Sequence, residues 1–267
     1  MTNPSVDLLI TPQWPVQNIQ AYTTTRGLQS SDSKLSFNSA QQKFSDFNLG
    51  LHVGDDAPHV IENRRRLSSF LPEKTRIQWL NQVHGSDVAY VTSYSEEPIT
   101  ADAAITQSKD IALSIMTADC LPILLANKDG SEVAAIHGGW RSLDAGIIAN
   151  TINLMETSAE SLYAWLGPCI GVNAFEVGED VKNSFIAHDK RFIDAFSLKL
   201  DNSKAPKKVV DAKYWADLHR IAHLQLTEAG LHQVFTLNQC TYSNPKRYYS
   251  YRRDGQTGRM ATVICRR

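Results

Sequence analysis

Residues 111–155 read IALSIMTADCLPILLANKDGSEVAAIHGGWRSLDAGIIANTINLM, and this segment carries the clearest structural pattern of the chain. Apolar residues alternate with smaller ones over 111–115, which is typical of a strand buried mainly on one face. Further strands are predicted over 122–126 and 133–136, on either side of the turn sequence Asn-Lys-Asp-Gly at 127–130. A helical spacing of apolar residues follows two consecutive glycines, so we expect strands and a helix to pack together here.

Similar patterns predict other elements along the chain. The helix after the two glycines is expected to span 143–155. A second helix is predicted over about 213–229, and Gly230 occupies the position that commonly follows the end of a helix. Short strands are expected over 162–166 and 233–237. Strands and helices are thus interspersed without regular alternation, which predicts a mixed α/β fold of α+β type.

The two ends of the chain have patterns of their own. Residues 29–47 are polar and serine-rich, and they are predicted to form a long loop. A helix is expected after Asp56, which is suited to cap it, with Pro58 in its first turn. The C-terminal segment is interpreted as a hairpin with strands over 248–251 and 260–265.

Composition limits the kinds of protein that this chain can be. Its 267 residues suit one domain over 1–267, and a formal net charge of -1 gives no general attraction for nucleic acid or membrane. A mean hydropathy of -0.29 and the lack of a signal peptide or long apolar run predict a soluble protein. Four cysteines in this length do not suggest a disulfide framework, so we expect a reducing, cytoplasmic location.

Three short segments each place one metal-ligating side chain at the end of an apolar run. His84, Cys120 and His137 lie beside glycine or proline, where an α/β fold exposes its reactive groups. The separations between them exclude a zinc finger or ribbon with C-x₂-C spacing. A thiolate and two imidazoles that converge would form an open zinc site, because three protein ligands leave a position for water or substrate.

Other chemistry is compatible with the same residues. Without a metal, Cys120 would be a nucleophile and one histidine its base. Asp119 would either hydrogen-bond a ligand imidazole or stabilise a turn. Among the remaining cysteines, Cys169 is interpreted as a core residue or a neighbour of the site.

Several features of the sequence concern substrate recognition. Residues 138–142 open a predicted helix, and this segment is interpreted either as an anion site to which Arg141 contributes or as a tight turn. The three arginines at 64–66 cannot all face one way on a helix, so one is expected to point into a site. Tyrosines at 248, 249 and 251 would offer a stacking surface for a base or pack across strands.

The order of these motifs is similar to that of a known family. The chain resembles the laccase-domain, or YfiH-like, family, whose members have been described as multicopper polyphenol oxidases and later as purine nucleoside phosphorylases. The resemblance runs from about Thr23 to Met260 and beyond. It rests on the segments 48–50, 52–56, 63–64, 82–85, 101–103, 117–122, 137–141, 167–171, 175–178, 251–254 and 257–261.

This resemblance implies a single-domain sandwich of mixed β-sheets covered by helices. It implies a zinc ion held by His84, Cys120 and His137, which would also be the catalytic residues, with copper as an alternative metal. Asn48, Arg64 and Arg141 are predicted to bind substrate, and either arginine would hold phosphate. The implied partners are a nucleoside and phosphate, and the protein is expected to be a monomer or homodimer.

The resemblance also implies a set of reactions. They are phosphorolysis of adenosine, inosine, guanosine and S-methyl-5'-thioadenosine, together with deamination of adenosine. Alternatives are an amidase that edits peptidoglycan precursors, a copper polyphenol oxidase, and a metal-stabilised binding protein without turnover. The segment from Thr25 to Asn48 is longer than is usual in the family, which leaves substrate preference open.

Overall fold

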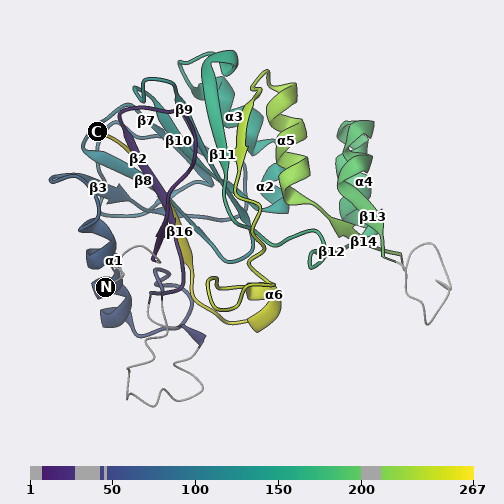
Figure 1. The fold of residues 1–267 in the computed structure, drawn as a ribbon, viewed down its shortest axis with the longest axis horizontal. Coiled ribbons are helices and arrows are strands. Elements are labelled where there is room, and N and C mark those ends of the chain that lie inside the picture. Colours follow the sequence, from purple (N-terminus) through teal and green to yellow (C-terminus); the bar gives the residue numbers. More distant parts are fainter. Residues whose placement is uncertain (1–7, 28–42, 45–46, 200–211) are drawn as a thin grey trace.

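Two β-sheets packed face to face form the centre of the protein (Figure 1). The computed structural model describes residues 8–27, 43–44, 47–199 and 212–267. Sheet A has the strand order β1-β2-β16-β8-β3, and sheet C has the order β15-β11-β9-β10-β7-β5. Both sheets contain parallel and antiparallel pairs, so the predicted mixed α/β sandwich is confirmed.

The strands of the two main sheets are short, as is usual for mixed sheets. In sheet A they are β1 (Leu9–Ile10), β2 (Ile19–Thr24), β16 (Met260–Arg266), β8 (Ile111–Thr117) and β3 (Arg76–Gln78). In sheet C they are β15 (Gln233–Thr236), β11 (Leu162–Leu166), β9 (Leu121–Asn127), β10 (Val133–Gly138), β7 (Ala103–Thr106) and β5 (Val88–Tyr90). A two-stranded pair joins β4 (Leu80–Asn81) to β6 (Ile99–Thr100) in parallel.

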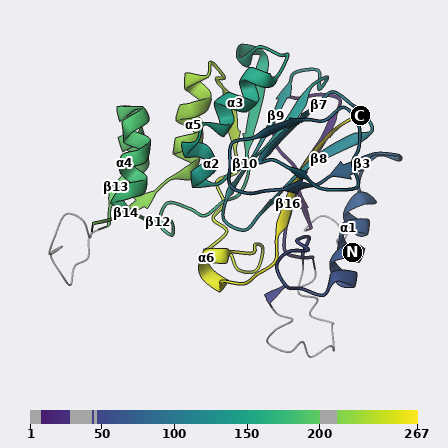
Figure 2. The same cartoon turned by 180° about the vertical axis from the view of Figure 1, so that it is seen from behind.

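Successive side chains of a central strand point to opposite faces of the sheet and so pack into two different layers of the core. In β9, Leu124 and Ala126 face sheet A, whereas Ile123 and Leu125 face the helices. Those helices are α2 (Trp140–Asp144), α3 (Ile147–Leu154) and α5 (Leu218–Glu228), and Figure 2 shows them on the side of sheet C away from sheet A. Helix α1 (Ala57–Ser68) covers the other face of sheet A through Leu67. The layer order is therefore helix, sheet, sheet, helices.

A smaller group of elements stands at one side of the molecule (Figures 1 and 2). Strands β12 and β13 pair with β14 on either side, in antiparallel fashion. Phe185 of the adjoining helix packs against Phe192 and Phe196, so this group shares the core that lies under the helices of sheet C. The elements are β12 (Glu176–Gly178), α4 (Glu179–His188), the 3₁₀ helix η3 (Lys190–Ala195), β13 (Phe196–Leu198) and β14 (Lys213–Ala216).

Several local predictions are confirmed. The Asp56 side chain accepts a hydrogen bond from the backbone N–H of His59 and caps α1, and Pro58 lies in its first turn. Gly230 follows the C-cap of α5 with a φ of 87°, the left-handed conformation that glycine adopts without strain. The strands predicted over 122–126, 133–136, 162–166 and 233–237 are all present.

Three predictions about the elements are wrong. Strand β8 is buried on both faces rather than one, because it lies inside sheet A with a second sheet above it. The helix predicted over 143–155 is two helices, α2 and α3, separated at Gly146. The helix predicted over 213–229 begins only at Leu218, because residues 213–216 pair in β14 and Asp217 caps α5.

The predicted C-terminal hairpin is also wrong. Residues 251–254 form the short helix α6 (Tyr251–Asp254), and β16 pairs with β2 and β8 instead of with residues 248–251. Tyr248 and Tyr249 are fully buried, so their aromatic pattern reflects core packing and not strand pairing. The loop predicted over 29–47 falls outside the described residues, except for positions 43, 44 and 47. None of the described helices has the length and apolar character that crossing a membrane requires.

Replacement of Gly146 distinguishes a break between two helices from one continuous helix, because the two arrangements predict opposite changes in the free energy of unfolding. Gly146 has a φ of 81°, and an added Cβ would meet no atom within 4 Å. Gly146→Ala should therefore destabilise the protein by about 1 kcal/mol through backbone conformation alone. In one continuous helix the same change would stabilise it by about 1 kcal/mol.

The measurement is the free energy of unfolding in urea. Asn153→Ala, on the exposed side of α3, is the control and should stabilise by a few tenths of a kcal/mol through helix propensity. A stabilising effect of Gly146→Ala would contradict the observed break between α2 and α3.

Candidate metal centre

Three strand ends bring one thiol and two imidazoles to the same edge of the two-sheet core. His84 follows β4, Cys120 lies in the connection from β8 to β9, and His137 is near the end of β10. The Cys120 Sγ atom lies 3.9 Å from His84 Nε2, and the ligating atoms of the three residues all lie within 4.8 Å of one another. The imidazole rings of His84 and His137 meet edge to face, with centroids 4.7 Å apart.

This donor set fits a small, borderline-soft metal ion. With metal–sulfur and metal–nitrogen bonds of about 2.3 and 2.05 Å, tetrahedral geometry places sulfur and nitrogen roughly 3.6 Å apart. Small side-chain rotations would bring Cys120 and His84 to that separation. Gly139 packs directly behind the group, and a Cβ there would lie 3.1 Å from the His84 ring and 3.4 Å from the Cys120 sulfur. The three side chains can thus hold an ion and leave one side of it open to a cavity.

The buried carboxylate of Asp102 organises two of the three candidate ligands. One oxygen lies 2.7 Å from His137 Nδ1, and the same oxygen accepts a 3.0 Å hydrogen bond from the backbone N–H of His84. The other oxygen accepts from the N–H groups of Val83 and Gly85. Because Nδ1 of His137 faces the carboxylate, Nε2 is directed toward the cavity as a ligand requires.

A second carboxylate, that of Asp119, fixes the segment that carries Cys120. Its oxygens accept hydrogen bonds from the hydroxyls of Thr241 and Ser250 and from the backbone N–H of Arg252. Asp119 therefore ties the β8–β9 connection to the C-terminal segment. The interpretation that Asp119 binds a ligand imidazole is wrong, because Asp102 occupies that place.

The backbone is strained at this site. His84 has a φ of 59° and Asp119 a φ of 96°, and residues other than glycine rarely adopt these left-handed conformations. Each is held by the hydrogen bonds of a buried carboxylate. Such strain costs about 1–3 kcal/mol per residue and persists only where surrounding contacts impose it, as is common at functional sites.

The ionisation of Cys120 and His137 is coupled. Burial alone would raise the pKa of the Cys120 thiol, but the adjacent His137 and His84 outweigh it and lower the pKa. Burial would likewise lower the pKa of His137, yet the Cys120 thiolate and the Asp102 carboxylate raise it. Cys120 thus tends toward the thiolate form, which is the form that binds metals and acts as a nucleophile.

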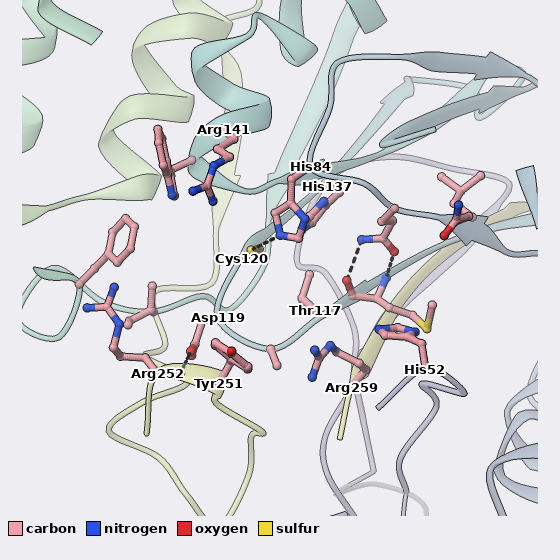
Figure 3. A pocket seen from close by; sticks show the side chains of 18 residues that line it. His52, His84, Thr117, Asp119, Cys120, His137, Arg141, Tyr251, Arg252 and Arg259 are labelled. Atoms are coloured by element: carbon pink, nitrogen blue, oxygen red, sulfur yellow. Dashed lines mark hydrogen bonds between the residues drawn. The ribbon is translucent and has the colours of Figure 1, made fainter. Parts of the chain in front are cut away.

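The three side chains lie at the wall of a cavity of about 620 Å³. In Figure 3 these three side chains lie between two pairs of basic residues, with Arg141 and Arg252 on one side and His52 and Arg259 on the other. The Gln82 amide braces the wall, because it donates to the backbone carbonyl of Met116 and accepts from its N–H. The lining comprises His52, Leu80, Asn81, Gln82, His84, Met116, Thr117, Ala118, Asp119, Cys120, His137, Trp140, Arg141, Ile170, Phe175, Tyr251, Arg252 and Arg259.

The predicted substrate-binding residues occupy different positions relative to this cavity. Arg141 lines it, and its guanidinium lies 4.5 Å from the centroid of the Trp140 ring. Arg64 does not line it; its guanidinium stacks on Trp79 and its Nε donates to a backbone carbonyl. Asn48 is fully buried behind the wall, where its side-chain oxygen accepts from the backbone N–H of Arg259. Of the three residues, only Arg141 can therefore touch a ligand in this cavity directly.

Sequence reasoning gave no role to several lining residues. These residues are His52, Phe175, Arg252 and Arg259. They come from separate segments of the chain, and the signal that pointed to them was that each falls within a motif shared with the family. Tyr251 lines the cavity and is 61% exposed. Tyr248 and Tyr249, which were grouped with Tyr251 as a stacking surface, are buried and do not line it.

Comparison with known proteins places the chain in a family. A family model described as "Multi-copper polyphenol oxidoreductase laccase" matches residues 33–267. The protein named "Purine nucleoside phosphorylase YfiH" from Shigella flexneri is 40% identical over 261 residues, which cover 96% of this chain and 98% of that protein. The chain belongs to the laccase-domain family.

Solved structures agree with this family membership. The crystal structure of the Neisseria meningitidis protein NMB0706 matches with a TM-score of 0.83 and 35% sequence identity, and it covers 97% of this chain and 99% of that chain. The structure of YlmD from Geobacillus stearothermophilus matches with a TM-score of 0.78 and 28% identity, covering 98% and 99%. The fold of this chain is therefore shared with both of these proteins.

The family description names several copper ions, but the described residues offer a smaller site. Among them, one group of three His, Cys, Asp or Glu side chains has the spacing of a metal centre, namely His84, Cys120 and His137. Multicopper chemistry requires additional sites rich in such ligands. The part of this chain that the structure describes thus offers one candidate site, with room for a single ion.

The role of Asp102 can be tested by removing its charge while keeping its shape. Asp102→Asn should lower the affinity for Zn²⁺ about 10- to 100-fold, because the His137 imidazole loses its orienting partner and an amide N–H₂ meets backbone N–H donors. Competition with a chromogenic chelator measures this affinity. Asp87→Asn, which removes the same charge from an exposed side chain in the adjoining loop, should bind Zn²⁺ like the wild type. Equal affinity in Asp102→Asn and the wild type would contradict the assigned role.

Proposed function

We propose that the protein is a zinc-dependent purine nucleoside phosphorylase. The observation that carries this proposal is the open two-histidine, one-cysteine centre in the wall of a cavity that also contains arginine and aromatic side chains. Relatives of similar length carry the name purine nucleoside phosphorylase, which supports the reaction class. A cavity of about 620 Å³ falls within the usual range for small-molecule sites.

The proposed substrates are adenosine, inosine, guanosine and S-methyl-5'-thioadenosine. Trp140, Phe175 and Tyr251 present ring surfaces on which a purine would stack, and Arg252 lies 5.3 Å from the centroid of the Phe175 ring. Aromatic surfaces accept different purines because every base has a π-face. We extend the proposal to deamination of adenosine, since an open zinc site also suits hydrolytic attack on the purine ring.

The residues of the centre have separate tasks in this proposal. His84, Cys120 and His137 would hold the metal, and Asp102 would orient His137 and the loop that carries His84. Bound zinc supplies a Lewis acid and acidifies its water. We prefer zinc to copper because neither proposed reaction transfers electrons, and the described residues contain one such centre. A reducing location such as the cytoplasm would keep Cys120 in the form that binds metal.

A second candidate function rests on the sequence of contacts from Asp102 to His137 to Cys120. A carboxylate that orients an imidazole next to a thiol is the arrangement of a cysteine hydrolase. An amidase acting on a peptidoglycan precursor would use Cys120 as its nucleophile. Such a reaction would survive removal of the metal by a chelator, whereas the zinc-dependent reactions would be lost.

Replacement of the thiol tests the leading proposal. Cys120→Ala should lose both bound zinc and turnover of adenosine, because the site loses its only anionic ligand. Zinc is measured by elemental analysis of purified protein. Products are measured by chromatography of adenosine reactions with and without phosphate. Adenine that forms only with phosphate reports phosphorolysis, and inosine in both reactions reports deamination.

The matched control is Cys265→Ala, which removes a buried thiol from the face of sheet A that packs against α1. This variant should keep about one zinc per chain and wild-type turnover at 25 °C. Full zinc content and turnover in Cys120→Ala would reject the ligand assignment. Metal-loaded wild-type protein that converts none of the four nucleosides would reject the phosphorylase.

A further inference from the structure

The cavity has two arms that differ in chemistry, with the candidate metal ligands between them. On one side Arg141 and Arg252 lie against the rings of Trp140 and Phe175 (Figure 3). This arm combines large apolar surfaces with positive charge. On the other side His52 and Arg259 lie together, well separated from the first pair of arginines.

Arg259 is held rigidly at the wall of the second arm. Its backbone N–H donates to Asn48, and its Nη1 donates to the carbonyls of Thr257 and Gly258. Its stem packs against Gly50, where an added Cβ would come within 2.9 Å of it. Nε and Nη2 have no acceptor among the described residues, so part of the guanidinium remains available to a ligand.

The basic side chains in and behind this arm are not held in ion pairs within the described residues. The ion pairs formed within the described residues do not include Arg64, Arg259 or His52. The Arg64 guanidinium is instead stacked on Trp79 behind Met116. Burial, together with Arg259 and Arg64, lowers the pKa of His52, which agrees with a positive potential at this end of the cavity. A half-buried guanidinium that forms no ion pair favours an anionic ligand.

The second arm also lies close to the candidate metal centre. Cys120, Asp119 and Arg259 line the same cavity, and the charges of the first two act favourably on the Arg259 guanidinium. Arg259 presents planar N–H donors that match a tetrahedral oxyanion better than a point charge does. An anion bound there would reach toward the space beside the metal ligands. The aromatic arm would remain free for a planar ring.

We propose that Arg259 and His52 form an oxyanion subsite that takes inorganic phosphate, with the purine in the aromatic arm. This assignment rests on the proposed phosphorylase function and differs from the sequence-based choice of Arg64 or Arg141. In the reaction, an oxygen of H₂PO₄⁻ forms a bond to C1′ of the ribose while the C1′–N9 bond breaks. The bonding electrons pass to N9, and the proton released by the phosphate goes to the leaving purine. The products are ribose 1-phosphate and the neutral base.

The experiment measures the phosphate and nucleoside dependence of phosphorolysis in zinc-loaded variants. Arg259→Gln should raise the KM for phosphate about 10- to 100-fold, as expected for the loss of charged hydrogen bonds, and change the KM for inosine less than threefold. Arg141→Gln, in the other arm, should show the opposite pattern. Arg65→Gln, on the exposed side of α1, should match the wild type in both constants.

The opposite result would overturn the assignment. If Arg141→Gln raises the KM for phosphate and Arg259→Gln does not, the anion binds in the aromatic arm. Because Arg259 also holds two backbone carbonyls, Arg259→Lys provides a second variant that keeps the charge but not the fork. We expect it to raise the KM for phosphate about 3- to 10-fold, and unchanged constants in both folded variants would reject the subsite.

Direct binding separates this proposal from the proposed function. Isothermal titration of zinc-loaded protein with inorganic phosphate should show binding that Arg259→Gln weakens at least 10-fold and Arg65→Gln leaves intact. If the wild type binds phosphate in this way but cleaves no nucleoside, the phosphorylase proposal fails and the oxyanion subsite stands. If nucleosides are cleaved with phosphate while Arg259→Gln binds phosphate normally, the subsite fails and the phosphorylase stands.

Discussion

The Asp102 carboxylate connects the parts of the candidate metal centre. It is fully buried, and it is satisfied by three backbone N–H groups of the loop at 83–85 and by the His137 imidazole. Removing one partner of a buried charge typically costs 3–5 kcal/mol, so the carboxylate, the loop and the imidazole stabilise one another. The left-handed backbone of His84 is held within this set of contacts. One side chain thus fixes the backbone of one candidate ligand and the ring of another.

The Asp119 carboxylate fixes the segment of the third candidate ligand, Cys120, through hydrogen bonds to residues that are distant in the sequence. Its bonds to Thr241, Ser250 and Arg252 join the β8–β9 connection to the segment that leads into β16. Strand β16 lies between β2 and β8 in the middle of sheet A. The centre is therefore completed only when the C-terminal strand is in place. Residues of the cavity come from nearly the whole length of the chain for the same reason.

The sequence predicted features that depend on neighbouring residues and missed those that depend on distant ones. His84, Cys120 and His137 were recognisable because each stands at the end of an apolar run beside glycine or proline. The role of Asp102 was not, because its partners are 17 to 35 residues away. Tyr248 and Tyr249 lie in a segment with the composition of a strand, but burial against Met260 and Ala118 places them in a core cluster. Gly146 breaks a helix whose apolar spacing continues across it, since periodicity does not report backbone φ.

Charge balance explains why the arginines, and not the metal alone, would attract a phosphate. A divalent ion held by two neutral imidazoles and the Cys120 thiolate retains one positive charge, and the Asp102 carboxylate behind His137 offsets it. The centre as a whole is then close to neutral. The cavity wall also contains the Asp119 carboxylate, whose oxygens accept three hydrogen bonds from the protein. Its positive side chains include Arg141, Arg252 and Arg259, none of which forms an ion pair within the described residues. Electrostatic attraction of an anion therefore falls to these side chains, and their separation into two arms decides where the anion lies relative to the metal.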